Sequence, residues 1–231
     1  MRIELPTREG RLLRRYKRFL ADVELPGGEV VTAHCPNTGS LTGCVPPGAR
    51  AILRDSQNPA RKLRWTLQTV EVDGTWVNVD TGLPNQLVAE AIEAGEVPEL
   101  GDFEELRREV SYGERSRVDI LLSRGERRCY VEVKSTTWAR GGRAYFPDAV
   151  TLRGRKHLEE LAAMVRAGQR AVLFLCIARF DVDSFAPADD VDPDYGRVLR
   201  RVAEEGVELL AYTTRVAPDR LELGDRLPVC L

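Results

Sequence analysis

The sequence predicts an α/β (α+β) protein with a mixed sheet over residues 83–231, preceded by a small all-β barrel over residues 1–82. Three observations support this fold class. Five short strand-like segments follow one another without a helix in the first part, and Thr81-Gly82-Leu83-Pro84 then breaks the pattern. From there on, segments with helical spacing alternate with apolar strands, which is typical of a sheet with helices on its faces.

The barrel is predicted from strands at residues 16–24, 29–35, 49–54, 63–72 and 75–79. Turn signals separate them, and Asp73-Gly74 is the strongest because this pair favours a tight hairpin. Five strands in so short a stretch match the OB-fold, a barrel that commonly binds single strands or oligonucleotides. Between them, the loop at 34–43 combines a proline, two glycines and small hydroxyls, so it is either a phosphate cradle or only a turn.

A basic segment precedes and enters the first predicted strand. Cations here could neutralise phosphates, and the neighbouring Tyr16 and Phe19 could stack on bases. The alternative is a solvated edge strand that its charges protect from aggregation. The predicted nucleic-acid contacts in this segment are Arg11, Arg14, Arg15, Lys17 and Arg18.

The second part contains a helix, three strands, a helix, a strand, a helix and a strand, in that order. Helices are expected at residues 85–96, with Asn85 as N-cap, at 150–167 and at 195–205. A first strand ends near residues 112–113, a hairpin follows, and further strands are expected at 171–178 and finally at 207–212. Gly141 and Gly142 predict a flexible loop at 139–144.

The hairpin at residues 116–135 carries the chemistry. Two β-branched runs flank a short charged loop, and a turn centred on Gly125-Glu126 would place Asp119 opposite Glu132, with Cβ atoms about 5 Å apart. Since side chains alternate along a strand, Glu132 and Lys134 share one face. Two carboxylates and an ammonium group therefore converge.

Carboxylates this close either share a proton or bind a divalent cation. Oxygen ligands suit Mg²⁺ or Mn²⁺, which would hold a phosphate and activate a water while Lys134 orients that water or neutralises charge on the phosphorus. The alternative is an ordinary exposed face with a weak ion pair. Because both faces of the hairpin are apolar elsewhere, charges inside it need partners.

Cations recur at the start of the predicted helix at 150–167, where Arg153, Lys156 and His157 could contact a phosphate backbone. The alternative is a basic solvated helix face. With 30% charged and 43% hydrophobic residues, the composition is that of a soluble globular protein, and no run of about 18 apolar residues could span a membrane. The N-terminus lacks the apolar stretch of a signal peptide, so we expect a cytoplasmic protein.

The residue identities around the hairpin are a more specific signal than the spacing of its charged residues. Asp119 followed by Glu132-x-Lys134 resembles the PD-(D/E)xK nuclease superfamily, whose fold includes restriction enzymes and junction resolvases. More specific segments are Ser116-Arg117-Val118-Asp119, Tyr130-Val131-Glu132-Val133-Lys134-Ser135, Phe146-Pro147-Asp148-Ala149, Arg155-Lys156-His157-Leu158 and His34-Cys35-Pro36-Asn37. Through these segments the chain closely resembles the sugar fermentation stimulation protein A family of bacteria and archaea over nearly its whole length.

The resemblance implies a DNA-binding protein that joins an OB-fold-like barrel to a PD-(D/E)xK nuclease-like domain. It places Asp119, Glu132 and Lys134 at catalytic positions and Asp119 and Glu132 at the metal. It also suggests a further carboxylate from the first helix, for which Glu90 is the choice here. The expected function is a Mg²⁺-dependent (or Mn²⁺-dependent) DNase, and the alternative is a DNA-binding protein without turnover. DNA is the expected partner, RNA is not excluded, and the oligomeric state is open, a homodimer included.

Overall fold

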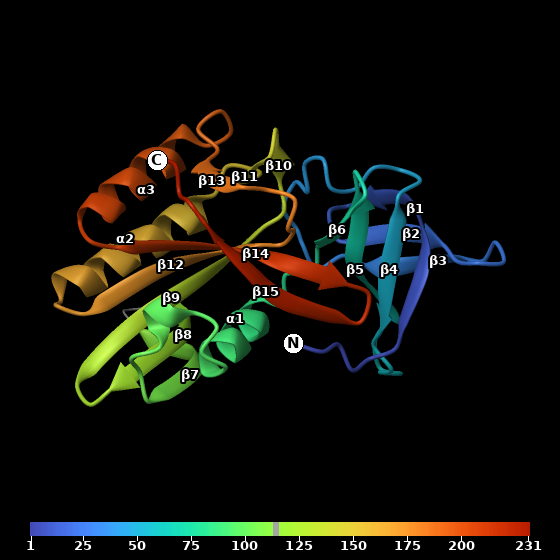
Figure 1. Cartoon of the computed structure of the whole chain (residues 1–231). Coiled ribbons are helices and arrows are strands. Elements are labelled where there is room, and N and C mark those ends of the chain that lie inside the picture. The colour runs from blue at the N-terminus through green and yellow to red at the C-terminus, as the bar shows by residue number, and fades with distance from the viewer. Residues whose placement is uncertain (113–115) are drawn as a thin grey trace.

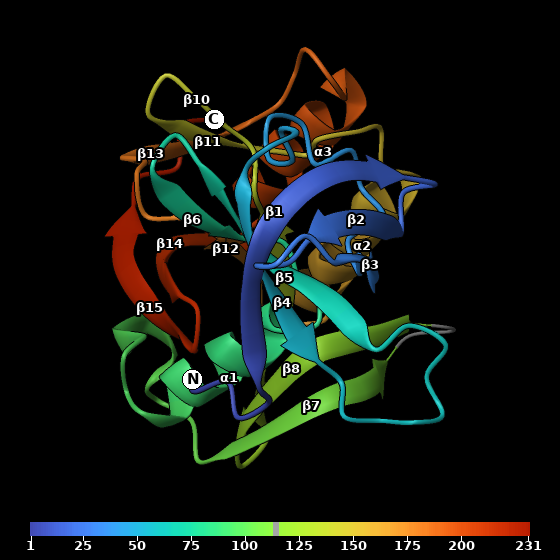
Figure 2. The ribbon, with the colours of Figure 1, turned by 90° about the vertical axis from the view of Figure 1, so that its right-hand side faces the viewer.

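A computed structural model describes residues 1–112 and 116–231 of the chain (Figure 1). Six strands form the N-terminal sheet in the order β3-β2-β1-β4-β5-β6, and a further β3–β5 pairing joins Ala33 to Trp65 and closes the sheet into a ring (Figure 2). This confirms the predicted OB-type barrel. The strands are β1 (Thr7–Tyr16), β2 (Leu20–Glu24), β3 (Val30–His34), β4 (Arg50–Asp55), β5 (Trp65–Val72) and β6 (Thr75–Asn78).

The first strand of the barrel differs from the prediction of a strand at 16–24. The chain is already extended from Thr7, and it turns at Lys17 and Arg18, whose φ angles are 50° and 65°. The sequence does not reveal the start of this strand, because most of its residues are polar or charged and only Leu12 of the ten is fully buried. Since β1 lies between β2 and β4, the alternative of an edge strand for the basic segment is also wrong.

The C-terminal unit is built on a six-stranded mixed sheet in the order β15-β14-β12-β9-β8-β7. β12 pairs in parallel with β9 and β14, and the remaining pairs are antiparallel. Its strands are β7 (Glu105–Tyr112), β8 (Ser116–Arg124), β9 (Arg127–Thr136), β12 (Arg170–Ile177), β14 (Glu208–Ala217) and β15 (Arg220–Leu227). A small sheet of β10 (Ala139–Arg140), β11 (Arg143–Phe146) and β13 (Ser184–Pro187) lies beside it.

Helices cover both faces of the large sheet (Figure 1). α1 (Pro84–Glu93) packs on the face that presents Ile120 and Val131, and a short 3₁₀ helix follows at Pro98–Leu100. α2 (Leu152–Arg166) and α3 (Pro193–Glu204) pack on the opposite face. The hairpin β8–β9 is therefore buried from both sides, as its lack of alternation predicts.

Three local expectations need correction. Helix α1 begins at Pro84 with Leu83 as its N-cap, so Asn85 lies within the first turn, and its side chain donates to Asp119. Residues 139–146 are not a flexible loop but a tight hairpin, in which Gly141 and Gly142 supply the two positive φ angles that such a turn requires. The strand expected at 207–212 continues to Ala217, and it is followed by β15. The predicted end of a strand at Gly113 lies outside the described residues.

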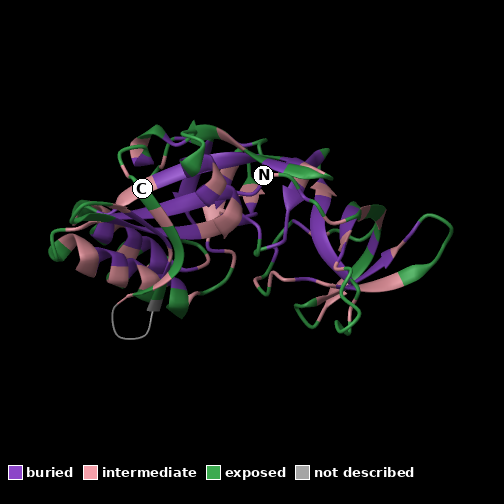
Figure 3. Cartoon of the chain, turned by 90° about the horizontal axis from the view of Figure 1, so that it is seen from below, coloured by how far each residue is buried: buried purple, intermediate pink, exposed green. Residues whose placement is uncertain are grey.

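Hydrogen bonds join the two units, which lie side by side in the view of Figure 3. The Asn78 N–H donates to the Ala178 carbonyl at 2.9 Å, and the Cys44 thiol contacts the Thr137 carbonyl at 3.3 Å. The first residues of the chain pair with the start of β15 and the turn before it: the Leu221 N–H donates to the Met1 carbonyl, and the Ile3 N–H donates to the Asp219 carbonyl. Within the described ranges, none of the helices combines the length and apolar character needed to span a bilayer.

Candidate active site

The register of the β8–β9 hairpin follows the prediction. Arg124 pairs with Arg127 across a turn at Gly125 and Glu126, and the ladder continues to the pair Ile120 and Val131. Asp119 is the next residue of β8, beyond the last pair of the ladder. At this position its side-chain carboxylate forms a hydrogen bond to β9. Oδ2 of Asp119 accepts from the Val133 N–H at 2.8 Å.

Helix α1 holds the other oxygen of Asp119. The Asn85 side-chain amide donates to Oδ1 at 2.7 Å, and the same amide lies 3.5 Å from Oε1 of Glu109 on β7. Asp119 is thus oriented by a backbone N–H from the neighbouring strand and a side-chain amide from the helix below. This fixes the carboxylate without supplying it with a counter-charge.

Glu132 has the opposite environment. Its side chain is 3% exposed, and Oε1 accepts from the Lys134 ammonium at 2.5 Å and contacts Nδ1 of His157. Its second oxygen, Oε2, is buried and has no hydrogen-bond partner among the described residues. A buried carboxylate oxygen without a partner is costly, so this atom is positioned to receive a ligand.

The two carboxyl groups consequently differ in pKa. Burial and repulsion from Glu132 raise the pKa of Asp119 to about 6, although the Val133 N–H, Lys134 and Asn85 partly offset this. Burial acts to raise the pKa of Glu132 as well, but the hydrogen bond from His157 and the charge of Lys134 outweigh it, so this pKa lies below its ordinary value. The cations of the site therefore neutralise one carboxylate and leave the other with an unfavourable charge.

His157 connects the carboxylates to helix α2. The Arg153 Nε–H donates to Nε2 of His157 at 3.2 Å, and an arginine can only donate. Nε2 is then an acceptor, which assigns the ring proton to Nδ1, the atom that contacts Glu132. Lys134 Nζ also lies 3.2 Å from Nδ1, so Lys134 and His157 meet at one oxygen of Glu132, and Arg153 is connected to that oxygen through His157.

These groups line a cavity of about 950 Å³ to which both units contribute. From the barrel come Arg18, residues 37–39 and Thr81, and from the C-terminal unit come the hairpin, the segment 145–151 and the start of α2. Seven of the predicted site residues lie here together. They are Asp119, Glu132 and Lys134 of the catalytic set and Arg18, Arg153, Lys156 and His157 of the nucleic-acid set.

Glu90 is not among them. It lies five residues after Asn85 and is therefore rotated by about 140° around the helix. Its carboxylate is 3.5 Å from the Met1 amino group, bonds to Gln86 at 2.8 Å and lines a separate hollow. The structure therefore does not bring Glu90 to Asp119 and Glu132.

The other predicted contacts on the barrel also lie outside the cavity lining. Arg14 forms an ion pair with the buried Asp22 at 2.8 Å, and Arg15 turns inward to backbone carbonyl groups. Arg11 and Lys17 are exposed at positions that do not line the cavity.

The cavity is also lined by residues that the sequence does not single out, among them Asn85, Glu109, Arg117 and Asp148. Glu109 follows two arginines on β7 without any motif, and only the register of β7 against β8 brings it beside Asp119. Asp148 and Arg117 lie in two of the segments that carry the family resemblance. Their place in these segments is the signal that could have identified them. Asn85 is expected from the sequence to be an N-cap, and that expectation does not predict its contact with Asp119.

Comparisons with known proteins agree with this two-part architecture. A family model described as the SfsA N-terminal OB domain matches residues 13–79, and one described as the sugar fermentation stimulation protein RE domain matches residues 82–220. A sugar fermentation stimulation protein homolog of Geotalea uraniireducens is 52% identical over 229 residues, 99% of each chain. One of Pelobacter propionicus is 54% identical over 226 residues, 98% of each chain.

A solved structure shares the fold over the full length of both chains. It is described as Pyrococcus furiosus SfsA in complex with Ca²⁺, and it is 29% identical to this chain with a TM-score of 0.89, covering 100% of each.

Proposed function

Since the chain belongs to the sugar fermentation stimulation protein family, we propose that it is a DNA-binding nuclease that uses Mg²⁺ or Mn²⁺ to cleave phosphodiester bonds. The observation that carries this proposal is the pair of Asp119, which is half-buried, and Glu132, which is buried, beside Lys134 in a cavity lined by cations. A protein that only binds DNA has no physical need for acidic groups that repel phosphate at the base of its cavity.

The residues present fit a divalent cation. Oε2 of Glu132 is buried without a partner, and the pKa of Asp119 is raised to about 6, so a cation would relieve both. Among the described residues, no group of three His, Cys, Asp or Glu side chains has the arrangement of a metal site. Mg²⁺ does not require one, because it keeps several waters and often binds through one or two carboxylates plus substrate phosphate. The relative from Pyrococcus furiosus is described with Ca²⁺, which supports a divalent site.

In this mechanism Asp119 and Glu132 would hold the cation, which when bound would supply Lewis acidity and a more acidic, nucleophilic water. Lys134 Nζ, held at 2.5 Å from Glu132, orients that water and stabilises negative charge on the phosphoryl oxygens. His157 fixes the rotamer of Glu132 through Nδ1, and Arg153 fixes His157. Water adds to phosphorus and gives up a proton, one P–O ester bond breaks, and the leaving sugar oxygen takes up a proton.

DNA binding without turnover is the second candidate, and one observation favours it. Lys134 and His157 both contact Oε1 of Glu132, so protein groups already neutralise part of the acidic pair. On this view the cavity would bind DNA through its cations, and the carboxylates would only hold those cations in place.

Cleavage of labelled single-stranded, double-stranded and branched DNA by wild type and Glu132→Ala, in Mg²⁺, Mn²⁺ and EDTA, separates the two. We expect metal-dependent cleavage that Glu132→Ala loses. The matched control is Glu126→Ala, which removes an exposed glutamate from the turn of the same hairpin and should cleave normally. Binding without cleavage in every metal would instead establish the second candidate.

A cytoplasmic location forms part of the proposal. All five cysteines are free thiols, and four of them are buried, which suits a compartment that keeps thiols reduced.

A further inference from the structure

The barrel contributes a fixed wall to the catalytic cavity through loop 37–41, the segment that follows β3. From the barrel side, Nη2 of Arg15 donates to the carbonyls of Asn37 and Gly39, both at 2.8 Å, and Nη1 donates to that of Ser40 at 3.1 Å. From the other unit, Oδ2 of Asp148 accepts from the Leu41 N–H at 2.7 Å. The loop is thus anchored from both units at once.

The contact between the loop and Asp148 is close-packed. A Cβ atom added to Gly39 would lie 2.9 Å from Oδ1 of Asn37 and 3.0 Å from Oδ1 of Asp148, so both side chains would have to shift. Asp148 belongs to the segment that lines the cavity between β11 and α2. Opening the cavity on this side therefore requires the loss of a charge-assisted hydrogen bond and of tight packing.

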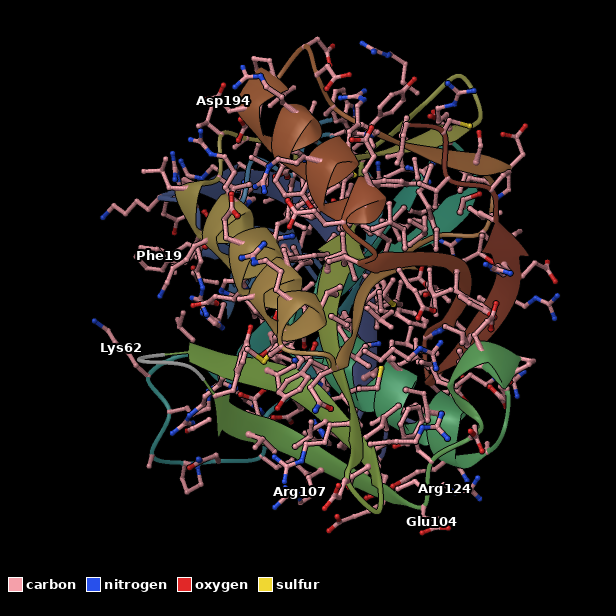
Figure 4. The ribbon with its side chains drawn as sticks, turned by 90° about the vertical axis from the view of Figure 1, so that its left-hand side faces the viewer. Phe19, Lys62, Glu104, Arg107, Arg124 and Asp194 are labelled. Atoms are coloured by element: carbon pink, nitrogen blue, oxygen red, sulfur yellow. The ribbon has the colours of Figure 1, made fainter. Side chains whose placement is uncertain are left out.

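Cations stand on both sides of this cavity. Arg18 comes from the turn between β1 and β2, whereas Arg117 and Arg153 come from β8 and α2. Apolar groups accompany them: Phe19, next to Arg18, is 45% exposed, and Val150, in the lining, is 66% exposed. In Figure 4, Phe19 projects from the side of the molecule on which α2 lies. Phosphates and unpaired bases are the ligand groups that such a mixture suits.

The carboxylates lie in a recess. Glu132 is 2% exposed, and the cavity volume of about 950 Å³ is at the upper end for small-molecule pockets, enough for a few nucleotides. A duplex carries its phosphates on a cylinder with a persistence length of about 50 nm, so it cannot bend a short backbone segment inward. A single strand can.

We propose, resting on the nuclease function above, that the substrate is DNA that is single-stranded where it enters the cavity. The strand contacts Arg18 of the barrel and Arg153 of α2 at the same time, and loop 37–41, held by Arg15 and Asp148, excludes an intact duplex. The barrel is then a wall of the active site and not only a separate DNA-binding module.

Binding by fluorescence anisotropy in EDTA and in Ca²⁺ tests this without turnover. The probes are a short labelled single strand, the blunt duplex of the same sequence, and that duplex with a single-stranded tail. We expect the single strand and the tailed duplex to bind at least about tenfold more tightly than the blunt duplex. In Mg²⁺, cleavage should fall within the unpaired part of the tailed duplex.

Two variants address the two sides of the argument. Arg18→Ala should weaken single-strand binding several-fold and reduce the slope of log affinity against log salt by about 0.7, the loss of one phosphate contact. Its control is Arg11→Ala, an exposed arginine of β1 outside the cavity lining. Asp148→Ala should reduce the discrimination against duplex to about threefold. Asp148→Asn keeps an acceptor for Leu41 and should retain the discrimination, as should Asp190→Ala at an exposed site.

The outcomes separate this inference from the proposed function. Equal affinity for the blunt duplex and the single strand, or cleavage inside the blunt duplex as fast as in the single strand, would overturn the inference and leave the nuclease intact. Selective single-strand binding with no cleavage in any metal would remove the nuclease and support the inference. A loss of discrimination in Asp190→Ala equal to that in Asp148→Ala would refute the role of the loop.

Discussion

Two basic segments of this chain carry similar charge and have different roles. Residues 11–18 of the barrel hold five cations, of which only Arg18 lines the cavity, because Arg14 pairs with Asp22 and Arg15 with backbone carbonyls. At the start of α2, by contrast, Arg153, Lys156 and His157 all line it. Charge density along a sequence therefore does not locate a binding site.

Backbone geometry explains the difference. On helix α2 the three basic residues are spaced i, i+3 and i+4, which places them on one face. On β1, successive side chains point to opposite sides, and the turn after Tyr16 changes direction again. A helix concentrates charge, whereas a strand and turn distribute it among other roles.

The largest expected effect comes from Lys134, which contacts both His157 of helix α2 and the carboxylate of Glu132. Lys134→Met removes the ammonium group beside Glu132 and should lower the rate of DNA cleavage by about 100- to 1,000-fold, because charge on the phosphoryl group loses its stabilisation. Affinity for DNA in EDTA should change little. Lys62→Met, at an exposed lysine of the barrel labelled in Figure 4, is the control. An equal loss of rate in both variants would abolish the distinction between site and surface cations.

The next-largest effect tests whether the cations of the site stabilise the negative charge of Glu132 more than that of Asp119. The pKa of Asp119 is raised from 3.8 to about 6, so the native state binds more protons than the unfolded state between these values, and stability falls as pH rises through them. Asp119→Asn should therefore stabilise the metal-free protein above pH 6, by up to about 3 kcal/mol, and have little effect near pH 4.

Glu132→Gln should show the reverse. The pKa of Glu132 lies below its ordinary value of 4.5, so its ionised form contributes stability above that pH and loses it as the pH falls. We expect destabilisation at pH 7 that diminishes under acid conditions. Urea unfolding of both variants from pH 4 to pH 8 in EDTA provides the measurement. Parallel pH profiles for the two variants would contradict the unequal environments described here.

Much of the candidate site could be predicted from local pattern. The turn at Gly125-Glu126 and the alternation around Glu132 fix the hairpin register, because one face of a buried strand must match its partner. The OB-type barrel and the mixed sheet likewise follow from the spacing of strands, helices and turn residues. These features depend on neighbours in sequence or directly across a turn.

What could not be predicted depends on tertiary placement. Glu90 is a carboxylate on the expected helix, but it is rotated by about 140° from Asn85. Only the packing of α1 on the sheet decides that the face with Asn85, and not the face with Glu90, meets Asp119. Arg15 carries the same charge as Arg18, and only the path of loop 37–41 decides that its guanidinium faces inward. The wall formed by Asp148 joins residues 107 positions apart.

A smaller effect concerns DNA affinity. Removing two cavity cations in Arg153→Ala/Lys156→Ala should weaken single-strand binding by about tenfold and lower the salt slope by about 1.4. The same loss of charge in Arg11→Ala/Lys17→Ala should change affinity less than twofold, since neither residue lines the cavity. Anisotropy titrations at several salt concentrations measure both. A larger effect of Arg11→Ala/Lys17→Ala would show that the barrel surface around β1, not the cavity, binds the DNA strand.

The smallest effect distinguishes structure from binding at a single residue. Arg15→Lys keeps the positive charge but loses the planar fork that reaches the carbonyls of Asn37, Gly39 and Ser40 at once. We expect a loss of about 1–2 kcal/mol in unfolding free energy, measured by urea titration, with faster amide exchange in loop 37–41. Arg11→Lys, on the exposed part of the same strand, should change neither. If Arg15 were a phosphate contact, stability would be unaffected and the affinity for a single strand would fall with the lost geometry. The predicted combination, lower stability with the DNA salt slope preserved, would show that this arginine belongs to the wall of the cavity and not to its contents.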